Sequence, residues 1–314
     1  MTEAFEQARA LAAAGDPPSF PRIWSLAEDL DDAELRALDE ALAAWDDYDR
    51  KVPALHKETG PVLRLARGWH MSGCNDVGWF ADCADLSNLR FLTITGKIGP
   101  EGVATLARSA PLQDVHTLTL HGTGMRDEGA AALATGFERL RTLRLVGAQL
   151  GAEGVAAICQ SPKFAKLETL MLAGASDDHA AALARTTLCL ARLELPEAEL
   201  TVEGFEAIAS STGLASVRAL DLGDASPTAE SLEVLLRGLP KLEALALANH
   251  EDLPLDALKG CTTLRRLDLQ GCFFDDDDAL ALIGTPLLAN LESIELGLDA
   301  LSEDAIARIR AAVG

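Results

Sequence analysis

The sequence predicts an α/β solenoid, a curved stack with an inner parallel β-sheet and outer helices, preceded by an α-helical cap. A short leucine pattern returns nine times between residues 89 and 296. A glycine-rich turn and an amphipathic helical segment follow each copy, and this alternation is typical of solenoid repeats. The first 80 residues are built differently, because they hold all four Trp and the only Tyr.

Residues 1–58 predict helices. An alanine-rich segment over 2–14 stops at Gly15, which is followed by Asp-Pro-Pro. Apolar residues then recur at spacings of three and four, and Asp31 and Asp32 open a further helix where its dipole favours acids. The segment holds 14 acids and 6 bases. We interpret residues 1–58 as a small acidic α-helical cap.

Residues 59–314 predict the solenoid, with about nine clear repeats and one degenerate first repeat. The clear copies read L-x-x-L-x-L, as in Leu-Arg-Thr-Leu-Arg-Leu at 140–145, and they begin 22 to 27 residues apart. We expect Val-Leu-Arg-Leu at 62–65 to supply the degenerate first strand. The central leucines of the pattern, such as Leu220, Leu245 and Leu267, are expected to be buried.

These repeats resemble the leucine-rich repeat family, and specifically its ribonuclease-inhibitor-like branch, which has a helix in every repeat. Residues 140–158 match best, and the resemblance covers roughly residues 60–314. It implies the fold and a binding role, because this fold carries many unrelated binding functions. Where the family usually keeps Asn or Cys after the strand, only Cys272 conforms.

Composition and charge restrict the functional classes. The chain has 314 residues, 48 % of them hydrophobic, and a net charge of −22. Such acidity repels phosphate backbones and anionic lipid, so neither nucleic acid nor a membrane is an expected partner. No apolar run is long enough to span a bilayer, and the charged start lacks a secretory signal. We expect a cytoplasmic protein with reduced thiols, of which Cys159 and Cys189 are buried.

No motif indicates an enzyme, a cofactor or a metal. The chain lacks a phosphate-binding G-x-x-x-x-G-K-[ST] loop and a G-x-S-x-G elbow. His70, Cys74 and Cys83 offer too few ligands for a zinc site, and their segment is better interpreted as a loop that seals the first repeat. The acids at 275–278 lack the alternation of a calcium loop and suit a helix start.

The concave sheet is the remaining candidate surface. Strand alternation directs the third, fifth and seventh positions of each repeat outward. The alternatives are an idle face, since Thr and Val are good strand formers, and a docking surface. The candidate partner-binding residues are Phe91, Thr119, Arg144, Met171, Arg192, Glu194, Asp221, Asp268 and Glu295.

The sequence therefore predicts a non-enzymatic protein-binding module that captures a protein partner, basic in character, on its concave sheet. An inhibitor, immunity or scaffold role fits this prediction. The alternative is a regulator of a small GTPase, which the resemblance implies because some members of this branch activate GTPases. Arg126 is the candidate residue for that role. The oligomeric state is left open.

Overall fold

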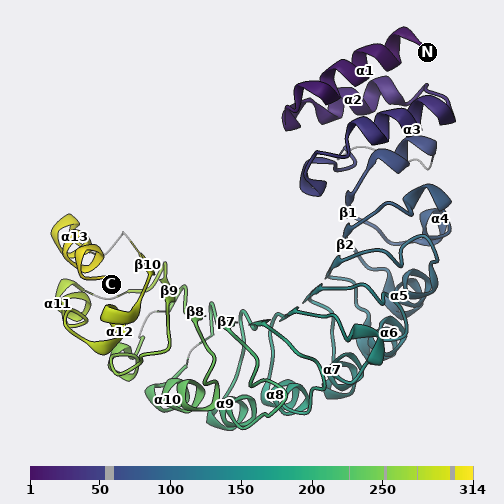
Figure 1. The fold of residues 1–314 in the computed structure, drawn as a ribbon. Helices are drawn as coiled ribbons and strands as arrows, with labels where there is room; N and C mark the ends of the chain where they lie inside the picture. Colours follow the sequence, from purple (N-terminus) through teal and green to yellow (C-terminus); the bar gives the residue numbers. More distant parts are fainter. Residues whose placement is uncertain (54–59, 226, 251–252, 274, 298–300, 314) are drawn as a thin grey trace. The chain divides into compact units, whose positions relative to one another are not determined.

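The computed structural model describes residues 1–53, 60–225, 227–250, 253–273, 275–297 and 301–313. The chain forms two compact units. The N-terminal unit comprises Met1–Leu143, Gly147–Leu150 and Pro162–Lys166, and the C-terminal unit comprises Arg144–Val146, Gly151–Ser161 and Leu167–Gly314. Within each unit the strands line one side and the helices of the repeats line the other (Figure 1). The predicted boundary between residues 58 and 59 lies outside the described residues.

The cap consists of α1 (Glu3–Ala14), α2 (Phe20–Ala27) and α3 (Asp32–Ala41), as predicted. Gly15 ends α1 with a left-handed φ of 66°. Asp31 opens α3 by accepting hydrogen bonds of 2.9 Å from the amides of Ala33 and Glu34. The apolar faces of the three helices pack together around Phe20, Trp24 and Leu38, which are buried.

In the described part of the chain, ten strands form one parallel sheet in chain order, which confirms the predicted α/β repeat solenoid. The strands are β1 (Gly68–Ser72), β2 (Phe91–Thr95), β3 (Thr117–His121), β4 (Thr142–Val146), β5 (Thr169–Leu172), β6 (Arg192–Glu194), β7 (Ala219–Asp221), β8 (Ala244–Ala246), β9 (Arg266–Leu269) and β10 (Ser293–Leu296). The helices of the repeats are α4 (Gly78–Ala81), α5 (Gly99–Arg108), α6 (Arg126–Leu133), α7 (Ala152–Cys159), α8 (Asp177–Leu183), α9 (Val202–Ala209), α10 (Ala229–Gly238), α11 (Asp276–Leu280), α12 (Pro286–Asn290) and α13 (Glu303–Ala312).

The core lies between the strand layer and the helix layer. Leu220, Leu245 and Leu267 are only 2 %, 3 % and 2 % exposed, which confirms their prediction as core positions. They occupy one register line, because Leu220 pairs with Leu245 and Leu245 with Leu267. A repeated leucine therefore becomes a continuous apolar row in the interior.

The first strand differs from the prediction. Residues 62–65 lie in a 3-10 helix, Pro61–Leu65, and β1 follows it at Gly68–Ser72. Trp69, not Leu63, pairs with Leu92 and so holds the core position of the first repeat. Pro61 explains the difference, because its fixed φ favours a helical first turn. Leu63 and Leu65 are buried there without belonging to a strand.

The turn after each of the strands β1 to β9 contains a residue with positive φ. Glycine supplies it in several repeats, for example Gly122 with φ 65° and Gly174 with φ 69°. Glu197, Asp224 and Asn249 take the same position after β6, β7 and β8, with φ of 56°, 59° and 64°. Side chains rarely adopt this conformation, and it costs roughly 1–2 kcal/mol per residue except in Gly and, less often, Asn or Asp.

Forked backbone hydrogen bonds mark the start of the strands. The carbonyl of Arg90 accepts from the amides of His116 and Thr117 at 2.8 and 3.0 Å, and the carbonyl of Arg67 accepts from Arg90 and Phe91 at 2.7 and 2.9 Å. The pattern continues into the cap, where the carbonyl of Arg50 accepts from Arg67 and Gly68 at 2.7 and 3.1 Å. The cap therefore pairs with the outer edge of β1 at Gly68, the first residue of the strand.

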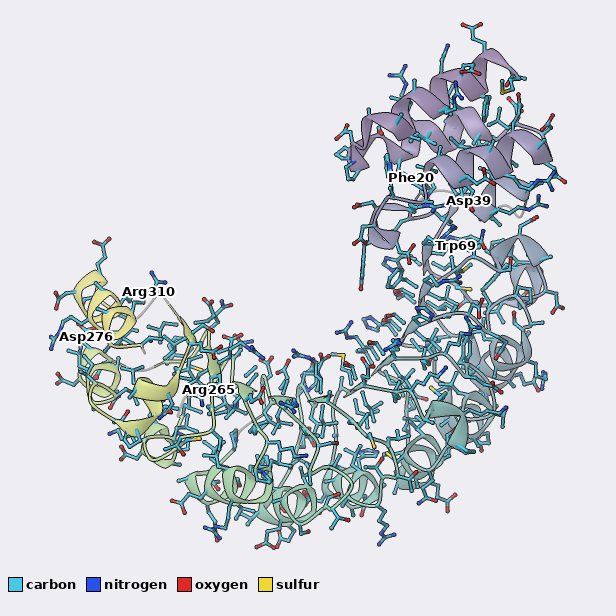
Figure 2. The ribbon with its side chains drawn as sticks, in the orientation of Figure 1. Phe20, Asp39, Trp69, Arg265, Asp276 and Arg310 are labelled. Atoms are coloured by element: carbon cyan, nitrogen blue, oxygen red, sulfur yellow. The ribbon has the colours of Figure 1, made fainter. Side chains whose placement is uncertain are left out.

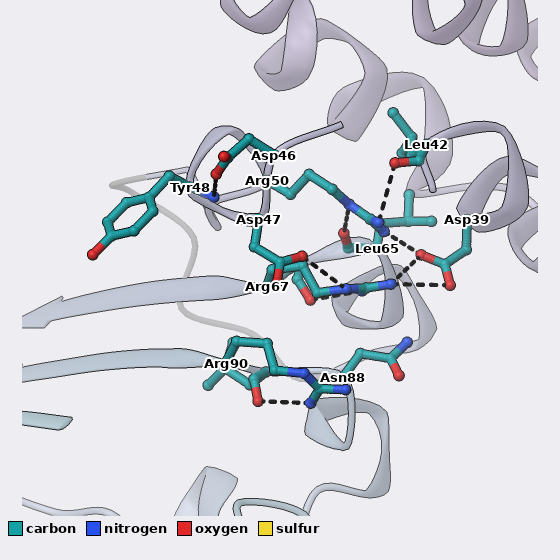
Figure 3. A network of polar contacts seen from close by, with 12 residues as sticks. Asp39, Leu42, Asp46, Asp47, Tyr48, Arg50, Leu65, Arg67, Asn88 and Arg90 are labelled. Carbon is teal, nitrogen blue, oxygen red and sulfur yellow. Dashed lines mark hydrogen bonds and ion pairs between the residues drawn. The ribbon is translucent and has the colours of Figure 1, made fainter. Parts of the chain in front are cut away.

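A buried ionic network fastens this junction (Figure 3). The side chain of Arg50 is 2 % exposed, donates from Nε to the Leu65 carbonyl at 2.9 Å, and forms an ion pair with Asp39. Arg67 donates from Nη2 to the same carboxylate at 2.9 Å. Burial lowers the pKa of the Arg50 guanidinium, and Arg67 adds to that effect, whereas Asp39 opposes it. Asp39 thus serves as counter-ion to two arginines.

Aromatic side chains pack together in the first repeat, but the segment predicted as a sealing loop contains β1 and the short helix α4. The ring of Trp69 lies 5.8 Å from that of Trp79 and 5.6 Å from that of Phe80, measured between centroids. Figure 2 shows Trp69 at the start of the strand layer, with Phe20 and Asp39 in the cap. One cysteine prediction is wrong. Cys159 is buried, but Cys189 is exposed, because it lies in the connection ahead of β6.

Candidate functional site

The strand face of the N-terminal unit carries Phe91 and Thr119. Phe91 pairs with Thr117 and Thr93 pairs with Thr119, so the two candidates are diagonal neighbours on β2 and β3. Both are half-buried. The ring of Tyr48, from the cap, lies 4.3 Å from that of Phe91, and Tyr48 itself is 55 % exposed. The exposed aromatic surface at this position therefore belongs mainly to Tyr48.

Sequence reasoning missed Tyr48 as a member of this face. It lies in a short 3-10 helix, Asp47–Asp49, and the Lys51 ammonium stands 5.0 Å from its ring centroid. The available signal was a single Tyr inside an acidic stretch. Nothing in that signal indicates that the cap folds back onto the sheet.

The strand face of the C-terminal unit aligns the other candidates in register. Met171 pairs with Glu194, and Glu194 pairs with Asp221. The same line runs through Ala246 to Asp268 and on to Glu295. Four of these six positions are acidic, so the acids predicted separately form one row across the unit. We call Glu194, Asp221, Asp268 and Glu295 the acidic row.

Glu194 and Arg144 form a paired set. Arg144 donates from Nε to Glu194 Oε2 at 3.2 Å and from Nη2 to Oε1 at 3.4 Å, a two-pronged contact from β4 to β6. Arg192 Nε lies 3.9 Å from Oε1 of the same carboxylate. The Glu194 side chain is only 10 % exposed and the Arg144 side chain 38 %. The negative charge of Glu194 is therefore neutralised. The two-pronged contact in turn holds the Arg144 guanidinium in a fixed orientation.

Asp221 and Asp268 make equivalent contacts in their repeats. Asp221 Oδ1 accepts from the Gly223 amide at 2.9 Å, and Asp268 Oδ1 accepts from the Gln270 amide at 2.9 Å. Each carboxylate is thus fixed by its own turn. Among the residues that the structure describes, no cation forms an ion pair with either aspartate. Both carboxylates are therefore held in defined positions, and no described Lys or Arg lies close enough to neutralise them.

The floor between these two aspartates is small and apolar. Ala246 lies between Asp221 and Asp268 in register, with Ala244 on the same strand. Strands lie about 4.8 Å apart, so the two aspartates bracket a gap of roughly 10 Å between Cα positions. A basic side chain lying over Ala246 would reach a carboxylate on each side.

The residues considered above as metal ligands, or as a catalytic arginine, do not form a common site in the described part of the chain. Over the described ranges, no group of three or more His, Cys, Asp or Glu side chains is arranged to hold a metal ion. Cys74 donates to the carbonyl of Asp76 at 3.2 Å. The acids at 275–278 open α11, where Asp275 accepts from the Asp278 amide at 3.0 Å. Arg126 begins α6 and is exposed, with a left-handed φ of 54°.

Comparisons with known proteins support a leucine-rich repeat protein. A family model for the leucine-rich repeat matches residues 140–159 and 260–282. No curated protein matches the chain significantly. A chain in the crystal structure of the Rad7 and Elc1 complex from yeast is similar at 17 % identity and a TM-score of 0.54, over 98 % of this chain and 79 % of that one. An internalin, InlF of Listeria monocytogenes, gives 15 % identity and a TM-score of 0.45, over 89 % and 91 % of the two chains.

At 17 % identity, the likeness to the chain of the Rad7 and Elc1 complex shows the fold alone. Leucine-rich repeat proteins generally mediate protein–protein interaction. No helix in the described part of the chain has the length and apolar character needed to cross a membrane.

Proposed function

We propose that the chain is a non-enzymatic protein-binding module that captures a basic protein partner on its strand face. The observation that supports this most is the acidic row, which the strand register assembles from four separate repeats of the C-terminal unit. A basic surface laid on that row meets a carboxylate on four of five successive strands, with Ala246 on the fifth. An inhibitor, immunity or scaffold role is compatible with this mode of binding.

The members of the row contribute differently. Asp221, Asp268 and Glu295 attract a basic partner, because no cation in the described residues pairs with them. Glu194 is already neutralised by Arg144, so its part is to hold the Arg144 guanidinium in place beside Met171. Arginine is enriched among the residues that dominate binding energy, and both arginine and methionine are enriched in protein interfaces. Asp221, Asp268 and Glu295 thereby supply the long-range attraction, and Arg144 and Met171 supply the short-range contact.

The fixed geometry lowers the cost of binding. Asp221 and Asp268 are each held by a turn amide, and the strand layer behind them is tightly packed. Side chains that are already ordered lose little entropy when a partner arrives. We therefore expect association without rearrangement of this face.

The repeats favour the ribonuclease-inhibitor-like branch of the family, because most connections between strands contain an α-helix. We place the module in the cytoplasm. The six cysteines are all free thiols, which suits a reducing compartment.

The first test maps the binding face. A photo-reactive amino acid is placed at Ala246 on the strand face or, as a control, at Glu206, which is exposed on α9. Cross-linked proteins are identified by mass spectrometry. We expect a basic protein cross-linked at Ala246 and not at Glu206. Cross-links that form only at Glu206 would show that the partner binds the helical side.

The second test measures the charge effect with the purified partner. The double variant Asp221→Asn with Asp268→Asn keeps the side-chain oxygen that accepts from the turn amide and removes the negative charge. We expect association at low salt to slow by at least about fivefold, with a flatter salt dependence. Glu206→Gln together with Glu203→Gln is the matched control on α9 and should associate like the wild type. Equal rates for both double variants would contradict the proposal.

A further inference from the structure

A hollow in the N-terminal unit is lined by more cationic than acidic side chains, although the protein as a whole is acidic. It has a volume of 870 Å³ and lies where three successive connections lead from helix to strand. Arg139, Lys163 and Lys166 line it, together with Asp114 and Glu138. We call it the basic hollow. It lies on the connections that precede the strands, so it is separate from the strand face.

A row of basic residues is linked to the basic hollow through Asp114, which pairs with Arg90 as well as with Arg139. Arg90, His116 and Arg141 each stand one residue before a strand, and the forked backbone bonds place them on neighbouring rungs. His116 donates its amide to the Arg90 carbonyl, and Arg141 donates its amide to the His116 carbonyl, both at 2.8 Å. Neighbouring rungs are about 4.8 Å apart, so Arg90 and Arg141 stand about 10 Å apart at their backbones, one on each side of His116, and both raise the positive potential at the imidazole.

The acids of the basic hollow only partly balance its cations. Asp114 lies 3.0 Å from Arg139 Nε and 3.9 Å from Arg90 Nη1, so one carboxylate serves two arginines. Glu138 forms an ion pair with Lys163. The lining of the basic hollow thus holds three cations, Arg139, Lys163 and Lys166, against two acids, in a chain whose net charge is −22.

The positive charge around the basic hollow affects the pKa of His116. Burial lowers its pKa, and Arg90 and Arg141 lower it further, while Asp114 opposes them and Arg139 adds to the lowering. The imidazole is therefore neutral at neutral pH, and an anion placed beside it would favour its protonation.

The wall of the basic hollow is rigid. Gln113 donates from Nε2 to the carbonyls of Ala107 and Ser109 at 3.1 and 2.8 Å, and its Oε1 accepts from the Phe137 amide at 2.9 Å. One side chain thereby ties the end of α5 to the connections before β3 and β4. A preformed wall reduces the ordering cost of a ligand.

We propose that the basic hollow binds an acidic peptide segment of a protein partner, extended across the three connections. Two repeat spacings of about 5–10 Å each amount to some 10–20 Å, which about three to six extended residues cover at ~3.3 Å per residue. Carboxylates of the segment would form charge-assisted hydrogen bonds with Arg139 and Lys166. This inference does not depend on the proposed strand-face function, because it concerns a different surface.

A short peptide fits this charge distribution better than nucleic acid does. Duplex DNA carries one charge per ~1.7 Å and continues beyond any single hollow, so its flanks would meet the acidic remainder of the protein. Charges further away than about 8 Å are largely screened at physiological salt. A segment of a few residues therefore experiences the cations of the basic hollow and little of the net negative charge.

The test uses a fluorescein-labelled hexaglutamate peptide and the full chain, and binding is followed by fluorescence anisotropy from about 0.15 M salt upward, where charges more than about 8 Å away are largely screened. We expect saturable one-to-one binding that weakens with added salt, whereas labelled hexaglutamine does not bind. Arg139→Gln with Lys166→Gln should weaken binding at least about tenfold. Lys97→Gln with Arg126→Gln removes two exposed cations of the same unit outside the basic hollow, and should change affinity by less than about twofold.

A second readout follows His116 by NMR. The bound peptide should raise the pKa of His116, because carboxylates stabilise the imidazolium, and affinity should rise as pH falls through its titration. The proposal is overturned if hexaglutamate shows no saturable binding, if both double variants bind alike, or if the pKa of His116 does not move. Tighter binding of a single-stranded oligonucleotide than of hexaglutamate would also overturn it and would indicate a nucleic-acid site.

Discussion

Removal of the Asp39 carboxylate should destabilise the N-terminal unit more than any exposed ion pair does. Asp39→Ala leaves the Arg50 guanidinium, which is 2 % exposed, without its counter-ion, although the carbonyls of Leu65 and Leu42 remain as acceptors. Breaking a fully buried pair costs about 3–5 kcal/mol. The Asp39 side chain is 28 % exposed, so we expect a smaller loss, about 2–3 kcal/mol.

The same helix offers a matched control. Asp32 forms an ion pair of 2.9 Å with Arg64, but its side chain is 61 % exposed, so Asp32→Ala should cost less than about 1 kcal/mol. Urea unfolding followed by tryptophan fluorescence measures both variants. All four tryptophans lie in the first 80 residues, so the signal reports on the N-terminal unit. Equal losses for the two variants would refute the assignment of Asp39 as a buried counter-ion.

Two further predictions concern the interior of the repeats. Leu220→Ala should cost ~2–5 kcal/mol in denaturant unfolding, because the side chain is 2 % exposed, and a loss below about 1 kcal/mol would contradict the register given for β7. Burial raises the pKa of the Cys159 thiol to about 11, so its alkylation, followed by mass spectrometry, should lag far behind that of exposed Cys189 at neutral pH and accelerate as pH rises. Since the unfolded thiol loses its proton first, the contribution of Cys159 to stability should decline above about pH 9, and equal alkylation of both thiols at neutral pH would contradict its burial.

The strand register could be predicted because it follows from one leucine spacing. The first strand could not, because residues 62–65 carry the same apolar character as a strand and differ from one only through Pro61. Cys189 was predicted as buried for a similar reason, since its apolar neighbours do not reveal that it lies in a connection. Periodicity identifies regular elements, while the path of the chain between them depends on packing.

The candidate site was predictable in position and not in pairing. Alternation along each strand is enough to direct Arg144, Glu194 and Asp268 toward one face. Arg144 and Glu194 are 50 residues apart in the sequence. Their contact depends on how two side chains extend across the sheet, which a sequence pattern does not show. The basic hollow was missed because its residues lie in connections, which have no period to reveal them.

The Arg50 carbonyl has a consequence for how this chain behaves among copies of itself. A parallel sheet is a template that another strand can extend, and an open edge invites such growth. Arg50 occupies the acceptor position of a further rung while belonging to the cap, so the outer edge of β1 is already paired at its first residue, Gly68. The array of repeats thereby acquires a terminator on its N-terminal side. We infer that the cap protects against end-to-end polymerisation at that edge, a role separate from any partner the strand face binds.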